Sequence, residues 1–205
     1  MSCQLYLLTP PRIEAGFDQT LAAVLDTGAV SALQIRLKDH APAEIRRLAP
    51  PLVQLAQKRG VSVILNDDPV LAAELGADGV HIGQTDGTYK EARSTVGPNR
   101  IVGVTCHDSR HLAMQAGERG ADYVAFGAFF DTATKTPKSR ASLDLLEWWS
   151  EIFEIPCVAI GGITTENARP LVEAGADLLA VSGGVWNHPD GPVAAVQAFD
   201  ALMKD

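Results

Sequence analysis

The chain has 205 residues, of which 46% are hydrophobic and 20% are charged, and its formal net charge is −8 at pH 7. This length suits one domain over residues 1–205, and the composition is that of an ordinary soluble protein without a membrane-spanning run. The negative charge argues against a nucleic-acid-binding or anionic-membrane surface, because either needs a basic face. The three widely spaced cysteines predict neither a disulfide framework nor a zinc site, and no signal peptide is visible, so a cytoplasmic location is expected.

Eight short apolar runs recur along the chain, each followed by a polar or glycine-bearing break and an amphipathic stretch. Strands separated by helical crossovers run parallel, and apolar strands of this kind belong in a sheet covered on both sides. We predict a single (β/α)₈ TIM barrel; the alternative is a doubly wound open sheet, which usually has a glycine-rich turn after its first strand. The predicted strands are Leu5–Leu8, Leu33–Leu37, Val61–Leu65, Gly79–Ile82, Ile101–Val104, Tyr123–Phe126, Cys157–Ile160 and Leu178–Val181.

The stretches between these runs predict helices that end near glycine. Three Gly-Ala-Asp triplets begin at residues 76, 120 and 175, and in each the glycine is expected to supply a left-handed helix cap and the aspartate to begin the turn into the next strand. Thr165 or Asn167 is a candidate N-cap for one helix. The helical candidates include Ala43–Arg59, Val70–Leu75, Arg110–Arg119, Leu143–Ile152, Glu166–Ala174 and Val193–Leu202.

In such a barrel the active site lies at the carboxyl ends of the strands. After the second run, Gln34, Arg36 and Lys38 alternate with apolar residues, so they are expected to face the barrel interior or its mouth. Two cations there need either carboxylate partners or an anionic ligand. An arginine beside a lysine suits a diphosphate, and we therefore predict an anion site.

The third and fourth runs end near Asp67 and Asp86, which should face each other on neighbouring strands. Two carboxylates beside a diphosphate are a usual means of holding Mg²⁺. The structural alternative is a helix cap before Pro69, which suits Asp68 better than Asp67 or Asp86.

Glycine pairs follow the seventh and eighth runs, at Gly161-Gly162 and Gly183-Gly184. Glycine lets backbone N–H groups approach an oxyanion, and loops after strands seven and eight form the recurrent phosphate site of these barrels. The loop after the sixth run adds Lys135 as a further cation at the mouth. Buried structural histidine is the better interpretation of His81, whereas His107 follows a strand and could act as an acid or base.

Taken together, these residues closely resemble the pattern of the thiamine-phosphate synthase and thiazole tautomerase superfamily. The resemblance runs through most of the chain in family order. It rests on Gln34-Ile35-Arg36-Leu37-Lys38, Asn66-Asp67, the run from Ala77 to Asp86, Gly103-Val104-Thr105, Ala121-Asp122-Tyr123, Thr132-Ala133-Thr134-Lys135 and Ala159-Ile160-Gly161-Gly162-Ile163.

The resemblance implies that Mg²⁺ and basic residues withdraw diphosphate from a hydroxymethylpyrimidine, whose cation the thiazole nitrogen then captures. Small-molecule substrates and homo-oligomerisation are expected from the same family. Carried over by position, the residues that would hold the diphosphate are Arg36, Lys38, Asn66, Thr105 and Lys135. Asp67 and Asp86 would hold the metal, and Gln34 would contact the pyrimidine. The thiazole phosphate would be bound by Gly162, Val181 and Ser182, with Thr132 and Thr134 near the thiazole.

Some positions depart from the family pattern. Asp68-Pro69 stands where many members have a basic residue, and the segment 136–142 lacks the usual Pro/Gly-rich sequence. Three alternatives remain. One is a thiazole tautomerase, which needs a proton-shuttling histidine such as His107. The others are a non-catalytic binder of a thiazole or thiamine phosphate and another phosphate-sugar barrel, such as an epimerase. Retention of Arg36, Lys38, Asp67 and Asp86 favours the synthase.

Overall fold

The computed structural model describes residues 3–131 and 139–204, and its eight parallel strands form a closed barrel in chain order. The strands are β1 (Gln4–Leu8), β2 (Val30–Ile35), β3 (Ser62–Asn66), β4 (Gly79–Ile82), β5 (Ile101–His107), β6 (Tyr123–Gly127), β7 (Cys157–Ile160) and β8 (Leu178–Val181). β1 pairs with both β2 and β8, so the sheet has no free edge. The predicted TIM barrel is confirmed, and the open-sheet alternative is wrong.

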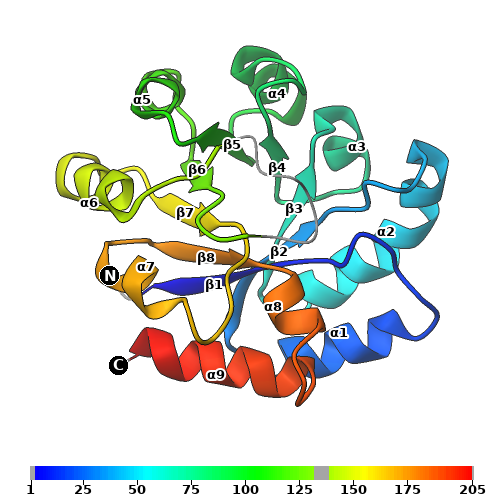
Figure 1. Cartoon of the computed structure of the whole chain (residues 1–205). Coiled ribbons are helices and arrows are strands. Elements are labelled where there is room, and N and C mark those ends of the chain that lie inside the picture. The colour runs from blue at the N-terminus through cyan, green and yellow to red at the C-terminus, as the bar shows by residue number, and fades with distance from the viewer. Residues whose placement is uncertain (1–2, 132–138, 205) are drawn as a thin grey trace.

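Helices surround the ring of strands (Figure 1). They are α1 (Phe17–Leu25), α2 (Pro42–Gln57), α3 (Pro69–Glu74), α4 (Tyr89–Val96), α5 (Arg110–Glu118), α6 (Leu143–Ile152), α7 (Arg169–Glu173), α8 (Gly183–Trp186) and α9 (Pro192–Lys204). None of these helices is long and apolar enough to cross a membrane in the part of the chain that the structure describes. The short α8 is additional to the one helix per strand that the repeat predicts.

The largest differences from the predicted strand boundaries are in β2 and β5, and the other boundaries agree to within one residue. β2 begins at Val30 and ends at Ile35, so Arg36 and Lys38 lie in the loop after the strand rather than on it. β5 continues to His107 instead of ending at Val104. The N-cap expected of Thr165 or Asn167 is also wrong, because α7 begins after Ala168, and Asn167 uses its side chain within the preceding turn.

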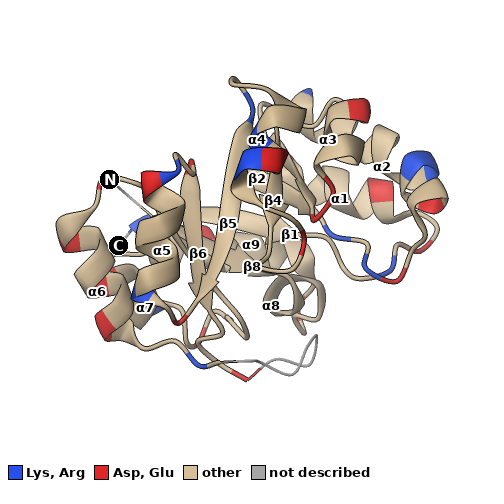
Figure 2. Cartoon of the chain, turned by 90° about the horizontal axis from the view of Figure 1, so that it is seen from above, with Lys and Arg blue, Asp and Glu red and all other residues tan. Residues whose placement is uncertain are grey.

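The strands are apolar because both of their faces are covered. Within the described chain, none of the eight strands contains Lys, Arg, Asp or Glu, and Figure 2 shows the charged residues on helices and loops. One apolar cluster fills the layer between sheet and helices, and a smaller one fills the barrel itself around Tyr6, Ile64, Tyr123 and Val158. Charged groups are therefore confined to segments that follow or precede the strands.

The Gly-Ala-Asp triplets join neighbouring strands at the amino end of the barrel. Their glycines have the positive φ of a left-handed cap, 67° at Gly76, 93° at Gly120 and 91° at Gly175, as predicted. Each aspartate carboxylate then accepts a hydrogen bond from a backbone N–H of the adjacent strand: Asp78 from Val63 at 2.7 Å, Asp122 from Val102 at 2.7 Å and Asp177 from Cys157 at 2.8 Å. The repeated motif is thus a repeated clasp between strands.

We predict that Asp177→Ala lowers the free energy of unfolding by about 1–3 kcal/mol, because the Cys157 N–H would lose its partner in a buried position. Urea denaturation followed by circular dichroism measures the change. Glu118→Ala, which alters an exposed carboxylate at the end of α5, is the control and should change stability by less than about 0.5 kcal/mol. Equal losses in the two variants would contradict the role assigned to the clasp.

Candidate active site

A cavity of about 420 Å³ opens at the carboxyl ends of the strands, and each of the eight strands or the loop after it contributes to the wall. The structure brings ten of the predicted site residues into this wall: Gln34, Arg36, Lys38, Asn66, Asp67, Asp86, Thr105, Gly162, Val181 and Ser182. The other three, Thr132, Thr134 and Lys135, lie outside the described residues. The cavity therefore brings together predicted site residues that are separated by up to 148 positions in the sequence, from Gln34 to Ser182.

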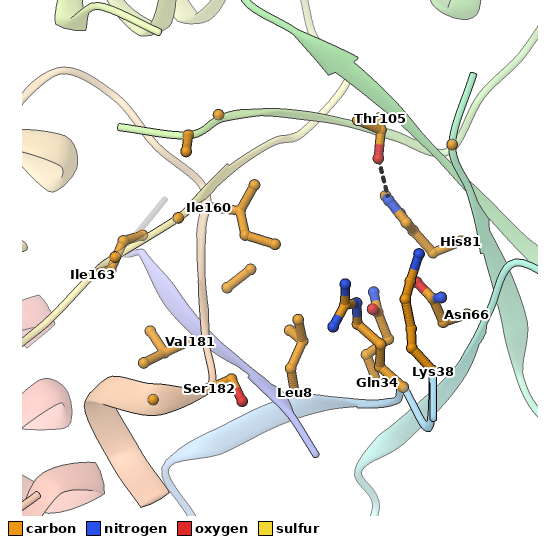
Figure 3. Close-up of a pocket in the computed structure, with 18 of the residues that line it drawn as sticks. Leu8, Gln34, Lys38, Asn66, His81, Thr105, Ile160, Ile163, Val181 and Ser182 are labelled. Atoms are coloured by element: carbon orange, nitrogen blue, oxygen red, sulfur yellow. Dashed lines mark hydrogen bonds between the residues drawn. The ribbon is translucent and has the colours of Figure 1, made fainter. Parts of the chain in front are cut away.

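Figure 3 shows that the cavity has two unlike sides. Gln34, Lys38, Asn66, His81 and Thr105 lie on one side, with their polar atoms near one another. Ile160, Ile163, Val181 and Ser182 lie on the other side, where apolar groups surround a glycine-rich backbone. The arrangement suits a ligand pair with one strongly charged end, an apolar middle and a second, backbone-bound end.

The cations of the polar side are held by the turn that follows β2. The Arg36 N–H donates to the buried Thr9 hydroxyl at 2.9 Å, and the Thr9 N–H donates to the Gln34 carbonyl oxygen, also at 2.9 Å. Burial lowers the pKa of the Arg36 guanidinium, and the nearby Asp67 and Asp39 oppose that shift. A half-buried guanidinium that lines a cavity in this way is ready for an anion.

The two carboxylates, Asp67 and Asp86, follow β3 and β4. Asp67 has a φ of 70°, and its N–H donates to the His81 carbonyl oxygen at 2.8 Å, so the backbone fixes the direction of its side chain. The Asp86 Oδ2 accepts from the Gly83 N–H at 3.0 Å, and a Cβ at Gly83 would lie only 2.7 Å from that oxygen. A side chain at Gly83 would displace the Asp86 carboxylate, so glycine at this position lets the carboxylate approach the backbone.

The charge balance around Asp67 explains its ionisation. Burial raises the pKa of the Asp67 carboxyl, the neighbouring Asp86 raises it further, and Lys38 opposes both. The Lys38 Nζ lies 3.2 Å from the Asp67 Oδ2. The neighbouring carboxylates of Asp67 and Asp86 favour a cation between or beside them, since a shared positive charge offsets their repulsion.

Asp67 and Asp86 also fit a magnesium ion by their chemistry. Among the described residues no group of three or more His, Cys, Asp or Glu side chains could hold a metal, so a complete protein-only site does not exist in that part of the chain. Mg²⁺ usually takes one or two carboxylates and completes its shell with water and substrate phosphate oxygens. Asp68, in contrast, caps α3 by accepting from the Leu71 N–H at 2.9 Å, as the sequence predicted.

The backbone-bound side is formed by the glycine turns after β7 and β8. Gly161 and Gly162 have φ of 106° and 66°, and a Cβ on Gly162 would collide with the carbonyl oxygen of Asp131. The Asn167 side chain holds this turn, because its Nδ2 donates to the Gly162 carbonyl at 3.0 Å and its Oδ1 accepts from the Thr164 N–H at 2.8 Å. The turn is thus fixed before any ligand binds.

The histidines behave differently from each other. His81 is buried, as predicted, and burial lowers its pKa to about 4, so it is neutral near pH 7. It nevertheless lines the cavity floor and bonds to the Thr105 hydroxyl at 2.7 Å. His107 also lines the cavity and has a φ of 55°, which is uncommon for a residue other than glycine.

Several residues of the site escape sequence reasoning. Thr9, Gly83 and Asn167 act through contacts with residues that the sequence does place in the site. A glycine three residues before an aspartate was the only local hint for Gly83. The Thr9 contact spans 27 residues, and it depends on the pairing of β1 with β2, which the sequence does not display directly.

Comparisons with known proteins show the family to which the chain belongs. The family described as thiamine monophosphate synthase matches residues 5–185. The chain belongs to this family. Its relatives include the thiamine-phosphate synthases of Rhodospirillum centenum, 61% identical over 203 residues with 98% of each chain covered, and of Erythrobacter litoralis, 56% identical over 200 residues with 96% and 93% covered. A solved thiamine phosphate pyrophosphorylase from Pyrococcus furiosus superposes with a TM-score of 0.86 at 30% identity, covering 98% of this chain and 95% of the other.

We predict that Gly162→Ala weakens binding of a thiazole phosphate by at least roughly tenfold, because the new Cβ displaces the turn that would present backbone N–H groups to the phosphate. Calorimetric titration measures the affinity. Gly191→Ala is the matched control, since Gly191 also has a positive φ, 86°, but has open space around it. Both variants should lose roughly 1–2 kcal/mol of stability from backbone strain, and equal losses of affinity would contradict the assignment.

Proposed function

We propose that this chain condenses a hydroxymethylpyrimidine diphosphate with a thiazole phosphate, giving thiamine phosphate and free diphosphate. The observation that carries the proposal is one cavity whose polar side joins Arg36 and Lys38 to Asp67 and Asp86, and whose opposite side is glycine-rich backbone. The family supports the same activity, because its matched relatives are thiamine-phosphate synthases.

The bond changes follow from where charge must be held. The bond between the pyrimidine methylene carbon and the diphosphate oxygen breaks, and its electron pair leaves with the oxygen. The thiazole nitrogen then donates its lone pair to that carbon, which forms the new carbon–nitrogen bond. The main contribution to the barrier is the negative charge that develops on the leaving oxygen. Preorganised cations at the diphosphate therefore supply the largest stabilisation of the transition state.

We infer that Mg²⁺ assists at this end, where Asp67 and Asp86 would hold it. When bound, the ion would neutralise charge on the diphosphate. Arg36, Lys38 and Asn66 would hold the remaining diphosphate oxygens, and Thr105 would donate its hydroxyl proton to another. The Lys38–Asp67 ion pair keeps the lysine at the cavity wall before substrate arrives.

The second substrate is assigned to the other side of the cavity. Gly162, Val181 and Ser182 would bind the thiazole phosphate, and Gln34 would contact the pyrimidine. Thr132 and Thr134 remain predictions for the thiazole, and Lys135 for the diphosphate. Neither a thiazole tautomerase nor a simple phosphate binder would need the cluster of Arg36, Lys38, Asp67 and Asp86.

We further propose that residues 1–205 form one domain. The barrel runs from Gln4 to Val181, and the C-terminal α9 packs back against β1 and α1. Homo-oligomerisation stays an expectation from the family.

The decisive assay incubates the protein with both substrates and Mg²⁺ and detects thiamine phosphate. We expect product from the wild type and a loss of roughly 100-fold or more in kcat/KM for Asp86→Ala, since removing a metal ligand removes several kcal/mol of charge stabilisation. EDTA should abolish product, and added Mg²⁺ should restore it.

Asp144→Ala, which removes an exposed carboxylate on α6, is the control and should keep full activity. Folded wild-type protein that binds both substrates but forms no product would contradict the proposal. Full activity in EDTA would support the synthase activity but contradict the proposed role of Mg²⁺.

A further inference from the structure

At the floor of the cavity, five polar side chains form a continuous network of hydrogen bonds that runs across the barrel and is largely buried. The Gln34 Nε2 donates to the Tyr6 hydroxyl at 2.9 Å, and the Tyr6 and Tyr123 hydroxyls are 2.9 Å apart. The Tyr123 hydroxyl lies 2.8 Å from the His81 Nδ1, and the His81 Nε2 lies 2.7 Å from the Thr105 hydroxyl. This network of hydrogen bonds therefore connects Gln34 on β2 with Thr105 on β5, both of which line the cavity.

The barrel interior is shaped around this network. The Tyr123 ring stacks on the His81 ring at 5.6 Å and meets the Tyr6 ring edge-on at 5.9 Å. Gly103 on β5 makes room for the Tyr123 ring, because any Cβ there would overlap the phenol carbons. Four members of the network are at most 7% exposed, namely Gln34, Tyr6, Tyr123 and His81. Water therefore cannot readily replace a lost hydrogen-bond partner there.

The Gln34 amide gives this network of hydrogen bonds one direction, because each link between the other members has only one proton. Each tyrosine hydroxyl has one proton, a neutral imidazole has one N–H, and the Gln34 Nε2 can only donate. Tyr6 accepts from Gln34, so its own proton must go to Tyr123; otherwise it would be buried without an acceptor. Tyr123 then donates to the His81 Nδ1, and the His81 Nε2–H donates to Thr105.

The ionisation of the members agrees with this order. Burial raises the pKa of both the Tyr6 and the Tyr123 phenol, so both keep their protons near neutral pH. The His81 ring is buried and both of its nitrogens bond neutral hydroxyls, so its imidazole carries a single N–H. With every member neutral, each link has a single proton, so the direction set at Gln34 extends unchanged to Thr105.

We propose that Tyr6, Tyr123 and His81 are positioning residues that couple the donor role of Thr105 at the diphosphate to the orientation of the Gln34 amide at the pyrimidine. Thr105 accepts from His81, so its own proton is free for a diphosphate oxygen, which can only accept. At the other end, the amide is held by its nitrogen on Tyr6, so its carbonyl oxygen is available to accept from an exocyclic amine.

The reverse order would change both ends at once. Thr105 would spend its proton on the His81 Nε2, and the Gln34 amide would turn its oxygen to Tyr6 and its nitrogen to the ligand. Such a site would match an oxo-pyrimidine better than an aminopyrimidine. The inference rests on the proposed function, and it deepens that function by naming what sets the choice between these two rings.

The first test reads the order directly and needs no turnover. Nitrogen-15 NMR of histidine-labelled wild-type protein near neutral pH, with the His81 signal assigned from His81→Gln, should show the Nε2–H tautomer. Tyr123→Phe should shift His81 towards a mixture of tautomers, because the Nδ1 loses its donor. An Nδ1–H tautomer in the wild type would overturn the inference.

The second test compares kcat/KM for the amino- and oxo-pyrimidine diphosphates. We expect Tyr123→Phe and Tyr6→Phe each to reduce the preference for the amino substrate by roughly tenfold, the effect of leaving one buried hydrogen-bond group unpaired. Tyr89→Phe is the matched control: its hydroxyl donates to the Gly120 carbonyl outside the barrel interior, so its loss should leave the preference unchanged.

The outcomes separate the two proposals. Synthase activity with an Nδ1–H tautomer, or with an unchanged preference in folded Tyr123→Phe, refutes the coupling and leaves the function intact. Absence of synthase activity refutes the function, while the tautomer still reports the proton order. If Tyr123→Phe does not fold, Tyr6→Phe tests the same link from the other side.

Discussion

Closure of the barrel is the constraint on which the rest of the structure depends. Because β1 pairs with both β2 and β8, no strand has a free edge, and all eight parallel strands deliver their carboxyl ends to one rim. Residues as distant in sequence as Gln34 and Ser182 thereby line one cavity. The Gly-Ala-Asp clasps fix the opposite end of neighbouring strands, so stability and function are located at different ends of the barrel.

The apolar strands explain why the site has two sides. The strands of the described chain themselves contain no charged residue, so the cations and carboxylates of the site lie at the turns after β2, β3 and β4 rather than inside the barrel. The interior below holds neutral polar groups that satisfy one another, from Gln34 to Thr105. The glycine turns after β7 and β8 offer backbone instead of charge, so the cavity has one charged side and one side of backbone and apolar groups.

Much of this architecture could be predicted from the sequence, because apolar runs and glycine breaks are local patterns. The barrel, the strand positions, the Asp68 cap and the gathering of Arg36, Asp67 and Asp86 at one cavity were all predicted. What could not be predicted depends on three-dimensional pairing: the Tyr6–Tyr123 hydrogen bond joins residues 117 positions apart. The end of β2 was misplaced because Leu37 continues the apolar alternation although its backbone has left the sheet.

The central claim is that one cavity holds two anions at once, and competition binding tests it most directly. The protein is saturated with inorganic diphosphate and Mg²⁺, and thiazole phosphate is then titrated in by calorimetry. The account predicts one thiazole phosphate per chain, with an affinity that the bound diphosphate does not reduce. Mutual exclusion of diphosphate and thiazole phosphate would contradict it, because a single shared anion site cannot bring the two substrates together.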